Sequence, residues 1–188
     1  DRWLDFGCGQ GHLLTHIRSF FPNMRVVGID ESQESRVFVE EIEGAVFSTS
    51  LEHVPGYLDV VSLVHVLEHC KEPRLVLEKI RGKLSKSGLI IIQVPNFLCN
   101  PFDLIIYDHG SFFSPQTISA FVSSCGFDVL AVDSSISRKE ITVVARPGEK
   151  NDAKNQMKCQ ELEQTFSILK SGAEELIRIR DDSQSRAR

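Results

Sequence analysis

The chain of 188 residues is 41% hydrophobic and carries a formal net charge of −5 at pH 7. A chain of this length and composition can bury one core of ordinary domain size. The acidic balance, without clusters of Lys and Arg, argues against a nucleic-acid partner, and since no apolar run reaches the length of a bilayer span, we expect no membrane-spanning segment.

A short apolar strand at the start of the chain runs directly into a glycine-rich turn. The strand is expected over Trp3 to Phe6, and Gly7, Gly9 and Gly11 follow with one residue between successive glycines. Glycine adopts positive φ without strain and lets a ligand lie against bare backbone. The three-to-four spacing of the next apolar residues predicts a helix over Gly11 to Phe21.

An acidic residue ends the second strand. The segment Arg25 to Asp30 has strand character, and Asp30 stands nineteen residues after Gly11. A carboxylate at this place accepts hydrogen bonds from ribose hydroxyls in dinucleotide-binding folds. Asp30 could instead cap the following helix, but its place at the end of a buried strand favours ribose binding.

Strand-length apolar runs alternate with helix-length segments as far as Val94. The further elements expected in this part are a helix over Gln33 to Glu43, strands over Ala45 to Ser48 and Asp59 to Val66, a helix over Pro73 to Leu84 and a strand over Leu89 to Val94. Continuous apolar strands joined by crossover helices indicate a parallel sheet with helices on both faces. The expected fold class is therefore α/β, with a doubly wound, mostly parallel sheet of the seven-stranded type.

The pattern changes after Pro95. No regular spacing is found over Asn96 to Gly110, and loops of this kind at the ligand edge of a sheet often select the substrate. A helix is expected with Ser114 as its N-cap and Gly126 at its end. The strands Asp128 to Val132 and Glu140 to Ala145 are joined by so short a connection that they should form an antiparallel hairpin.

Residues 148–188 form a polar tail with eight basic and eight acidic residues, so the net negative charge lies in residues 1–147. A heptad-spaced apolar seam predicts a helix in this tail: Leu162, Phe166, Leu169, Ala173 and Leu176. We expect one domain over residues 1–147 and a separate helical tail over residues 148–188. The tail could fold back on the domain as an amphipathic helix or linker, form a homodimer through a short coiled coil, or connect to a fused domain.

These motifs resemble those of the class I, Rossmann-like methyltransferases that depend on S-adenosylmethionine (SAM). In that family the first motif reads Asp/Glu-x-Gly-x-Gly-x-Gly, and an acidic residue forms the second motif; the matching residues here are Asp5, Gly7, Gly9, Gly11 and Asp30. The similarity covers about Arg2 to Arg146. Its late segments, Asp108 to Ser114 and Cys125 to Phe127, are similar to the subgroup that methylates small metabolites, sugars and lipid precursors.

The resemblance implies a reaction and a set of cofactor contacts. SAM would donate a methyl group to an oxygen, nitrogen or carbon nucleophile of a small molecule, such as a sugar, isoprenoid or polyketide-like acceptor, and S-adenosylhomocysteine (SAH) would be the product. Asp5, the three glycines and Asp30 would hold the cofactor. Ser50 and Leu51 stand where the family has an acidic residue and an apolar neighbour beside the adenine; Ser50 departs from the common Asp, so the backbone N–H of Leu51 is the expected contact. His65, at the C-terminal end of the fourth strand, either contacts the methionine end of SAM or is a loop histidine.

Two histidine patterns concern catalysis and metal binding. His109 is the candidate general base because imidazole titrates near neutral pH, although it could instead hold the loop before Ser114. His65 to His69 spells His-x-x-Glu-His, which is a zinc motif on a helix. Because the preceding residues have strand character and no third ligand is evident, we expect no metal; His12 and His16 are expected on the surface of the first helix.

Two other functions remain open. An NAD(P)-dependent oxidoreductase shares the strand, the turn and Asp30, but its motif Gly-x-Gly-x-x-Gly requires glycine where His12 stands. A non-catalytic methyltransferase-fold module of a larger protein is the second alternative, because the chain begins directly on its first strand and is expected to be N-terminally truncated. The five scattered cysteines suggest neither a disulfide framework nor a zinc ribbon, so a cytoplasmic location is expected.

Overall fold

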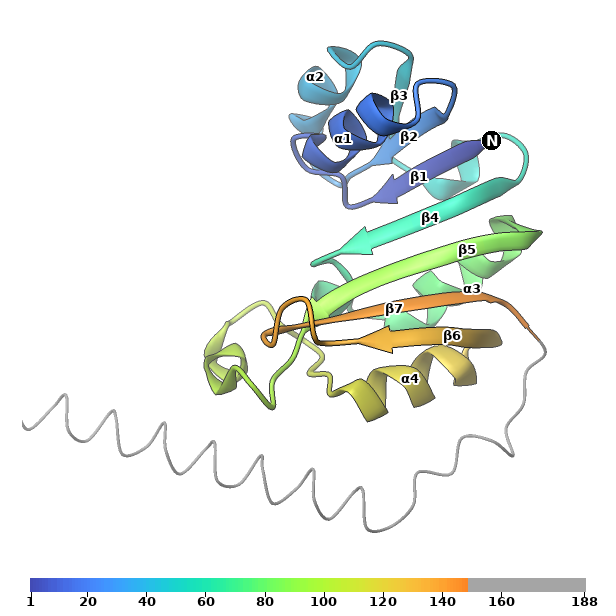
Figure 1. Ribbon diagram of the computed structural model, residues 1–188. Coiled ribbons are helices and arrows are strands. Elements are labelled where there is room, and N and C mark those ends of the chain that lie inside the picture. The colour runs from blue at the N-terminus through green and yellow to red at the C-terminus, as the bar shows by residue number, and fades with distance from the viewer. Residues whose placement is uncertain (149–188) are drawn as a thin grey trace, which may run out of the picture.

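A seven-stranded sheet forms the centre of the protein in the computed structural model, which describes residues 1–148 (Figure 1). The strand order is β3-β2-β1-β4-β5-β7-β6. The strands are β1 (Arg2–Phe6), β2 (Arg25–Ile29), β3 (Ala45–Ser48), β4 (Leu58–Val64), β5 (Leu84–Pro95), β6 (Phe127–Asp133) and β7 (Glu140–Pro147). The first five strands pair in parallel, whereas β7 is antiparallel to both β5 and β6. This arrangement confirms the predicted α/β fold and its terminal hairpin.

Both faces of the sheet are covered near β2. The helices are α1 (His12–Phe20), α2 (Ser35–Glu40), α3 (Pro73–Lys83) and α4 (Pro115–Ser124), with short 3₁₀ helices η1 (Leu51–His53), η2 (Leu67–His69) and η3 (Pro101–Ile105). Successive strand residues point to opposite faces. Val26 accordingly packs with α1 and α2, while its neighbour Val27 belongs to the cluster that contains residues of α3 and α4.

Local sequence explains where the helices begin. Gly11, with φ +74°, is the N-cap of α1. At α4, Ser114 and Thr117 form a capping box: the Ser114 hydroxyl accepts a hydrogen bond from the Thr117 N–H, and the Thr117 hydroxyl accepts one from the Ser114 N–H. The predicted N-cap at Ser114 is thus confirmed.

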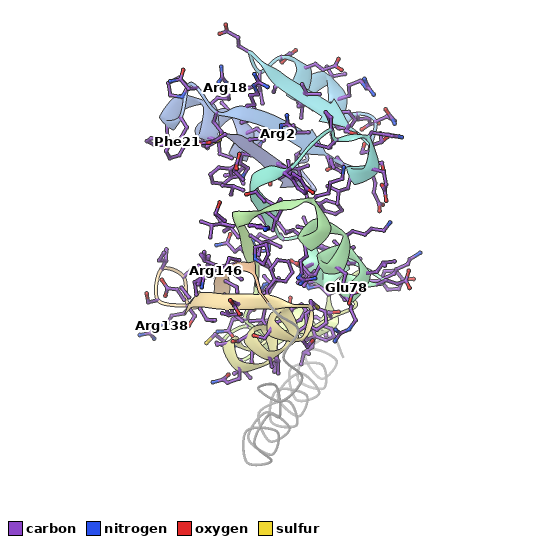
Figure 2. The ribbon with its side chains drawn as sticks, turned by 90° about the vertical axis from the view of Figure 1, so that its right-hand side faces the viewer. Arg2, Arg18, Phe21, Glu78, Arg138 and Arg146 are labelled. Carbon is purple, nitrogen blue, oxygen red and sulfur yellow. The ribbon has the colours of Figure 1, made fainter. Side chains whose placement is uncertain are left out.

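Arg18 connects α1 to the segments beside β2 and β3 (Figure 2). Its Nε donates to the carbonyl of Glu43 at 3.0 Å, and its Nη1 donates to the carbonyl of Met24 at 3.0 Å. These two carbonyls lie just before β3 and β2, so one guanidinium positions α1 over both strands. Arg18 lies in the last turn of α1, so it fixes the end of the helix that is farther from the glycine turn.

Three predicted boundaries were wrong. The strand expected over Leu89 to Val94 begins earlier, since β5 starts at Leu84; the four residues from Ser85 to Gly88 form an irregularity opposite Asp59, because the register shifts between Leu58 and Val60. β4 ends at Val64, so His65 follows the strand. The loop after Pro95 is not wholly irregular, since it contains η3.

The structure does not describe residues 149–188. The predicted heptad helix, with its dimerisation and fusion alternatives, lies in residues that fall outside the described part of the chain. Within residues 1–148, no helix is long and apolar enough to cross a bilayer.

Candidate functional site

A cleft lies at the carboxyl ends of β1, β2 and β4. The strand order changes direction at β1: β2 and β3 lie on one side of it, and β4 and β5 on the other. Ligands of open α/β sheets bind at such a switch point. The cleft has a volume of about 690 Å³. Its lining comes from the turn after β1, the end of β2, η1, the segment after β4 and α3: Phe6, Gly7, Ile29, Asp30, Glu31, Thr49, Ser50, Leu51, Glu52, His65, Val66, His69, Cys70, Lys71, Glu72, Leu75, Val76 and Lys79.

The glycine turn has the backbone conformation that its sequence predicts. Gly7, Gly9 and Gly11 have φ values of +80°, +48° and +74°. The N–H groups of Gly7 and Cys8 both donate to the carbonyl of Ile29, at 2.7 and 2.9 Å, which closes the turn against β2. A Cβ on Gly9 would meet no atom within 4 Å, so the backbone there is open to an approaching ligand.

Asp30 links the glycine turn to the start of α2. Its Oδ2 accepts a hydrogen bond from the Gly9 N–H at 2.8 Å, and its Oδ1 accepts one from the Ser32 N–H at 2.8 Å. A carboxylate offers about four lone-pair sites, so each oxygen keeps room for a further donor. Asp30 also lines the cleft, where ribose hydroxyls could supply such donors.

Asp5 lies beneath this turn rather than in the lining of the cleft. Its side chain is buried, and its Oδ1 lies 2.7 Å from the Ser62 hydroxyl, which in turn lies 2.9 Å from the Trp3 indole nitrogen. Indole nitrogen only donates, so the Ser62 hydroxyl accepts a hydrogen bond from Trp3 and donates one to Asp5. Burial raises the pKa of the Asp5 carboxyl to about 6, against the lowering effect of the Ser62 hydrogen bond; the negative charge of Asp30 raises it further.

This raised pKa predicts how stability depends on pH. The carboxyl has a pKa near 3.8 in the unfolded chain and about 6 in the folded protein, so the folded protein binds more protons between these values. The free energy of unfolding should therefore fall, by up to about 3 kcal/mol, as the pH rises from about 4 to about 6. In urea titrations across this range, Asp5→Asn should remove most of the fall and be more stable than the parent above pH 6.

The matched control for this prediction is Asp128→Asn, which removes one carboxylate that is half exposed. This variant should keep the fall in the free energy of unfolding that Asp5 causes, because Asp5 is unchanged in it. If Asp5→Asn and Asp128→Asn have the same profile as the parent, the titration of Asp5 does not control stability.

The predicted adenine contacts Ser50 and Leu51 both line the cleft. Ser50 is the N-cap of η1, where its hydroxyl accepts from the Glu52 N–H at 3.3 Å and also contacts the Glu52 carboxylate. Hydrogen bonds from the Ser50 hydroxyl and from Lys79 lower the pKa of Glu52 to about 2. The side chain of Ser50 is thus engaged with its own helix, while Leu51 is buried.

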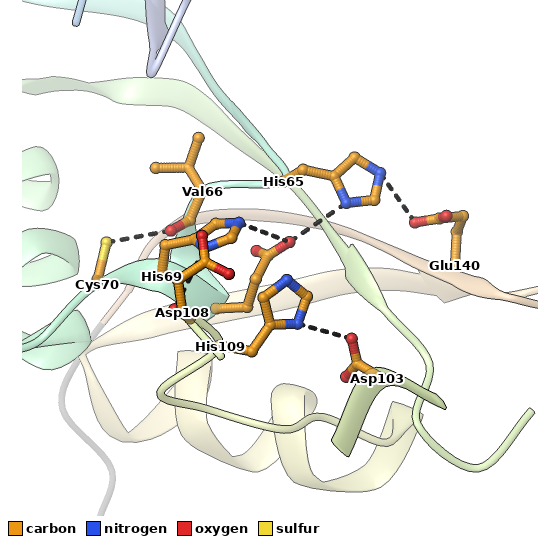
Figure 3. Close-up of polar contacts among 9 residues, drawn as sticks. His65, Val66, His69, Cys70, Asp103, Asp108, His109 and Glu140 are labelled. Carbon is orange, nitrogen blue, oxygen red and sulfur yellow. Dashed lines mark hydrogen bonds and ion pairs between the residues drawn. The ribbon is translucent and has the colours of Figure 1, made fainter. Parts of the chain in front are cut away.

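His65 has an unusual backbone and two acidic neighbours. Its φ of +54° is uncommon for a residue with a side chain. Nδ1 lies 3.2 Å from Oε1 of Glu68, and Nε2 lies 3.1 Å from Oε2 of Glu140 on β7 (Figure 3). The hydrogen bond to Glu68 raises the pKa of His65, against the lowering effect of its partial burial. His65 lines the cleft.

His109 lies outside the lining of the cleft. Its side chain is only 7% exposed, Nδ1 lies 2.7 Å from Oδ1 of Asp103, and its ring packs edge-on against His69 with centroids 4.6 Å apart. Sequence reasoning did not identify Asp103 and Glu140 as partners of these histidines. Neither residue belongs to a motif, so no sequence signal could have found them.

Comparisons with known proteins agree on one family. A family model described as "Methyltransferase domain" matches residues 1–132. (S)-Coclaurine N-methyltransferase of Thalictrum flavum subsp. glaucum is 29% identical over 99 residues, and trans-aconitate 2-methyltransferase of Methylobacterium radiotolerans is 24% identical over 102 residues. These matches cover 48% and 52% of the chain, and the chain spans only 27% and 39% of the two relatives.

Solved structures are similar in fold. A putative methyltransferase of Haloferax volcanii, in complex with the Trm112 methyltransferase activator, has a TM-score of 0.67 at 16% identity, over 79% of this chain and 83% of that chain. A complex of DhpI with SAH has a TM-score of 0.62 at 18% identity, over 78% of this chain and 76% of that chain.

Proposed function

Because this chain belongs to the methyltransferase domain family, we propose that it binds SAM in the cleft and transfers the methyl group to an oxygen, nitrogen or carbon nucleophile of a small molecule. The observation that carries the proposal is the joint position of Gly7 and Asp30 in the lining of a cleft of about 690 Å³, with the open backbone of Gly9 hydrogen-bonded to Asp30. We assign this function to a domain over residues 1–147.

The residues present fit such a cofactor. The bare backbone at Gly9 leaves room for the adenosyl group, and the outer lone pairs of Asp30 can accept from the ribose hydroxyls. Four carboxylates but only two ammonium groups line the cleft: Asp30, Glu31, Glu52 and Glu72 against Lys71 and Lys79. This charge balance favours a cationic ligand.

When bound, SAM supplies an activated methyl group on a cationic sulfonium. The chain's own contribution is then to orient the two reactants and to keep water from the reacting atoms. An oxygen or nitrogen acceptor also releases a proton, which a nearby base or water would take up. The role of His109 as the general base stays a prediction, since its ring is buried beside Asp103.

The acceptor class is proposed from the resemblance and from two relatives. One relative is named for N-methylation and the other for trans-aconitate, so a small molecule is favoured over a macromolecule as the acceptor. Sugars and isoprenoid or polyketide-like hydroxyl compounds belong in a first acceptor panel beside amines and carboxylic acids.

Calorimetric titration of the full chain with SAH and with NADH tests the cofactor. We expect SAH to bind with one site per chain and NADH to give no saturable heat, because the glycine spacing and the family both indicate SAM. Binding of NADH alone would overturn the proposal. Methyl-labelled SAM with the acceptor panel then separates an enzyme from a non-catalytic module, which would bind SAH and transfer nothing.

A further inference from the structure

Seven ionisable side chains gather beside the cleft, where η2, η3, the loop after η3 and the start of β7 meet (Figure 3). We call this group the histidine–carboxylate cluster: His65, Glu68, His69, Asp103, Asp108, His109 and Glu140. The backbone holds the segments together, because the N–H groups of Gly110 and Ser111 donate to the carbonyl of Glu68 at 2.8 and 3.2 Å. Residues some forty positions apart in the sequence are thereby fixed around one point.

Three members of the cluster converge as metal ligands would. Glu68, His69 and His109 each offer one nitrogen or carboxylate oxygen, and these three atoms lie within 4.8 Å of one another. Glu68 is 1% exposed, and among the described residues its Oε2 has no hydrogen-bond partner. A buried carboxylate oxygen without a partner is costly unless a cation or a donor meets it.

A carboxylate lies beside the same nitrogen, Nδ1, in both His69 and His109. Nδ1 of His109 lies 2.7 Å from Oδ1 of Asp103, and Nδ1 of His69 lies 3.2 Å from Oδ2 of Asp108 (Figure 3). Both contacts lie on the Nδ1 side of the ring and leave Nε2 on the other side; that between His109 and Asp103 is a close approach without hydrogen-bond geometry. Histidines that bind metals are held in this way by a carboxylate on their second nitrogen.

Glu68 is oriented in a similar manner. Its Oε1 lies 3.2 Å from Nδ1 of His65 and 4.0 Å from Nε2 of His69, so its other oxygen is the one that has no protein partner. His65 itself is engaged on both nitrogens, by Glu68 and by Glu140. The His-x-x-Glu-His segment therefore contributes Glu68 and His69, and the third ligand comes from His109 instead of His65.

We propose that Glu68, His69 and His109 bind a divalent transition-metal ion, with Zn²⁺ preferred over Mg²⁺. Two imidazoles and one carboxylate form a ligand set that suits zinc and leaves coordination positions open, whereas Mg²⁺ prefers oxygen ligands and water. The ion would also compensate the four carboxylates of the cluster. This assignment reverses the expectation of no metal, which rested on the strand character of the residues before His65 and on the absence of an evident third ligand.

Metal titration of the full chain tests the proposal without any methyl donor. After treatment with a chelator, the protein is titrated with Zn²⁺ and with Mg²⁺ by calorimetry, and with Co²⁺ by visible absorption. We expect one equivalent of Zn²⁺ to bind, Mg²⁺ to bind far more weakly, and Co²⁺ to give a spectrum of nitrogen and oxygen ligation. A sulfur-to-metal charge-transfer band would place the ion at a cysteine and overturn the assignment.

Single variants locate the ion. Glu68→Gln and His109→Asn should each weaken Zn²⁺ binding by about 100-fold or more, since each removes one of three ligands, and Asp103→Asn should weaken it by about 10- to 100-fold through the orientation of His109. Circular dichroism and thermal unfolding of the metal-free variants establish that each one folds. Glu68→Asp, which keeps the charge on a shorter side chain, serves as the second variant if Glu68→Gln does not fold.

The matched control changes a different pair of histidines. His12 and His16 are exposed and lie one turn apart on α1, so they could capture zinc at the surface. The double variant His12→Asn with His16→Asn should bind Zn²⁺ as the parent does. Loss of binding in this control, or full binding in both Glu68→Gln and His109→Asn, would overturn the proposal.

One consequence rests on the proposed function. His69 also lines the cleft, so an ion held here would lie where an acceptor oxygen could coordinate it and ionise more readily. Zinc-dependent transfer to hydroxyl acceptors but not to amines would support this consequence. Zinc binding without methyl transfer would count against the proposed function alone, and methyl transfer without zinc binding would count against the metal site alone.

Discussion

Replacing Asp30 with alanine is expected to weaken SAH binding on the order of 100-fold. The carboxylate lines the cleft and keeps lone pairs free for two ribose hydroxyls, and hydrogen bonds to a charged acceptor contribute about 1.5 to 3 kcal/mol each. Asp30 also fixes the Gly9 N–H at 2.8 Å, so the substitution loosens the turn as well. Calorimetry measures the total loss of affinity.

A ligand that lacks a ribose hydroxyl separates these two contributions. The parent protein should bind 2′-deoxy or 3′-deoxy analogues of SAH more weakly than SAH. The Asp30→Ala variant should bind these analogues and SAH equally well, because the acceptor of the ribose hydrogen bonds is gone. Glu40→Ala is the control for charge, since Glu40 is half exposed on α2 and does not line the cleft. Equal losses on removing the hydroxyl in both proteins would refute the ribose contact.

Gly7→Ala is expected to reduce the free energy of unfolding by about 3 kcal/mol or more. Gly7 has φ +80°, and a Cβ at this position would collide with Cγ2 of Val66. The left-handed backbone costs a residue with a side chain about 1 to 2 kcal/mol, and forcing an extra methyl group into a packed site adds about 1 to 3 kcal/mol. Urea unfolding of the ligand-free protein measures the loss.

Two further variants test the cause of this loss. Gly82→Ala in α3 is the matched control: its Cβ would meet nothing within 4 Å, and alanine favours the helix, so stability should stay the same or rise by up to about 1 kcal/mol. Combining Gly7→Ala with Val66→Ala should recover the part caused by the collision but not the part caused by φ. If Gly7→Ala is as stable as the parent, the turn differs from the one described here.

The sequence predicts the elements whose formation is local. The turn from β1 to α1 follows from three glycines at fixed spacing, and the N-cap of α4 follows from Ser114 beside a proline, so both were correct. The expected start of the fifth strand at Leu89 was wrong because Gly88 permits either a turn or a strand irregularity, and only the pairing of β5 with β4 decides between them. The same limit applies to the end of β4.

The histidine–carboxylate cluster could not be predicted, for a different reason. Its geometry depends on the path of the loop between β5 and α4, which the carbonyl of Glu68 determines by accepting from Gly110 and Ser111. No sequence pattern at Gly110 or Ser111 predicts this contact with Glu68. A motif search finds Glu68 and His69 together, whereas the approach of His109 is a property of the folded chain.

The position of β7 affects how this protein can be synthesised and folded. The last strand within residues 1–148, β7, is inserted between β5 and β6, where it pairs with both. Until residues 140–147 have left the ribosome, β5 keeps a free apolar edge and β6 has no strand beside it. Unpaired edges of this kind recruit other chains, so we expect a nascent polypeptide that ends before Glu140 to be prone to aggregation until β7 pairs with both neighbours.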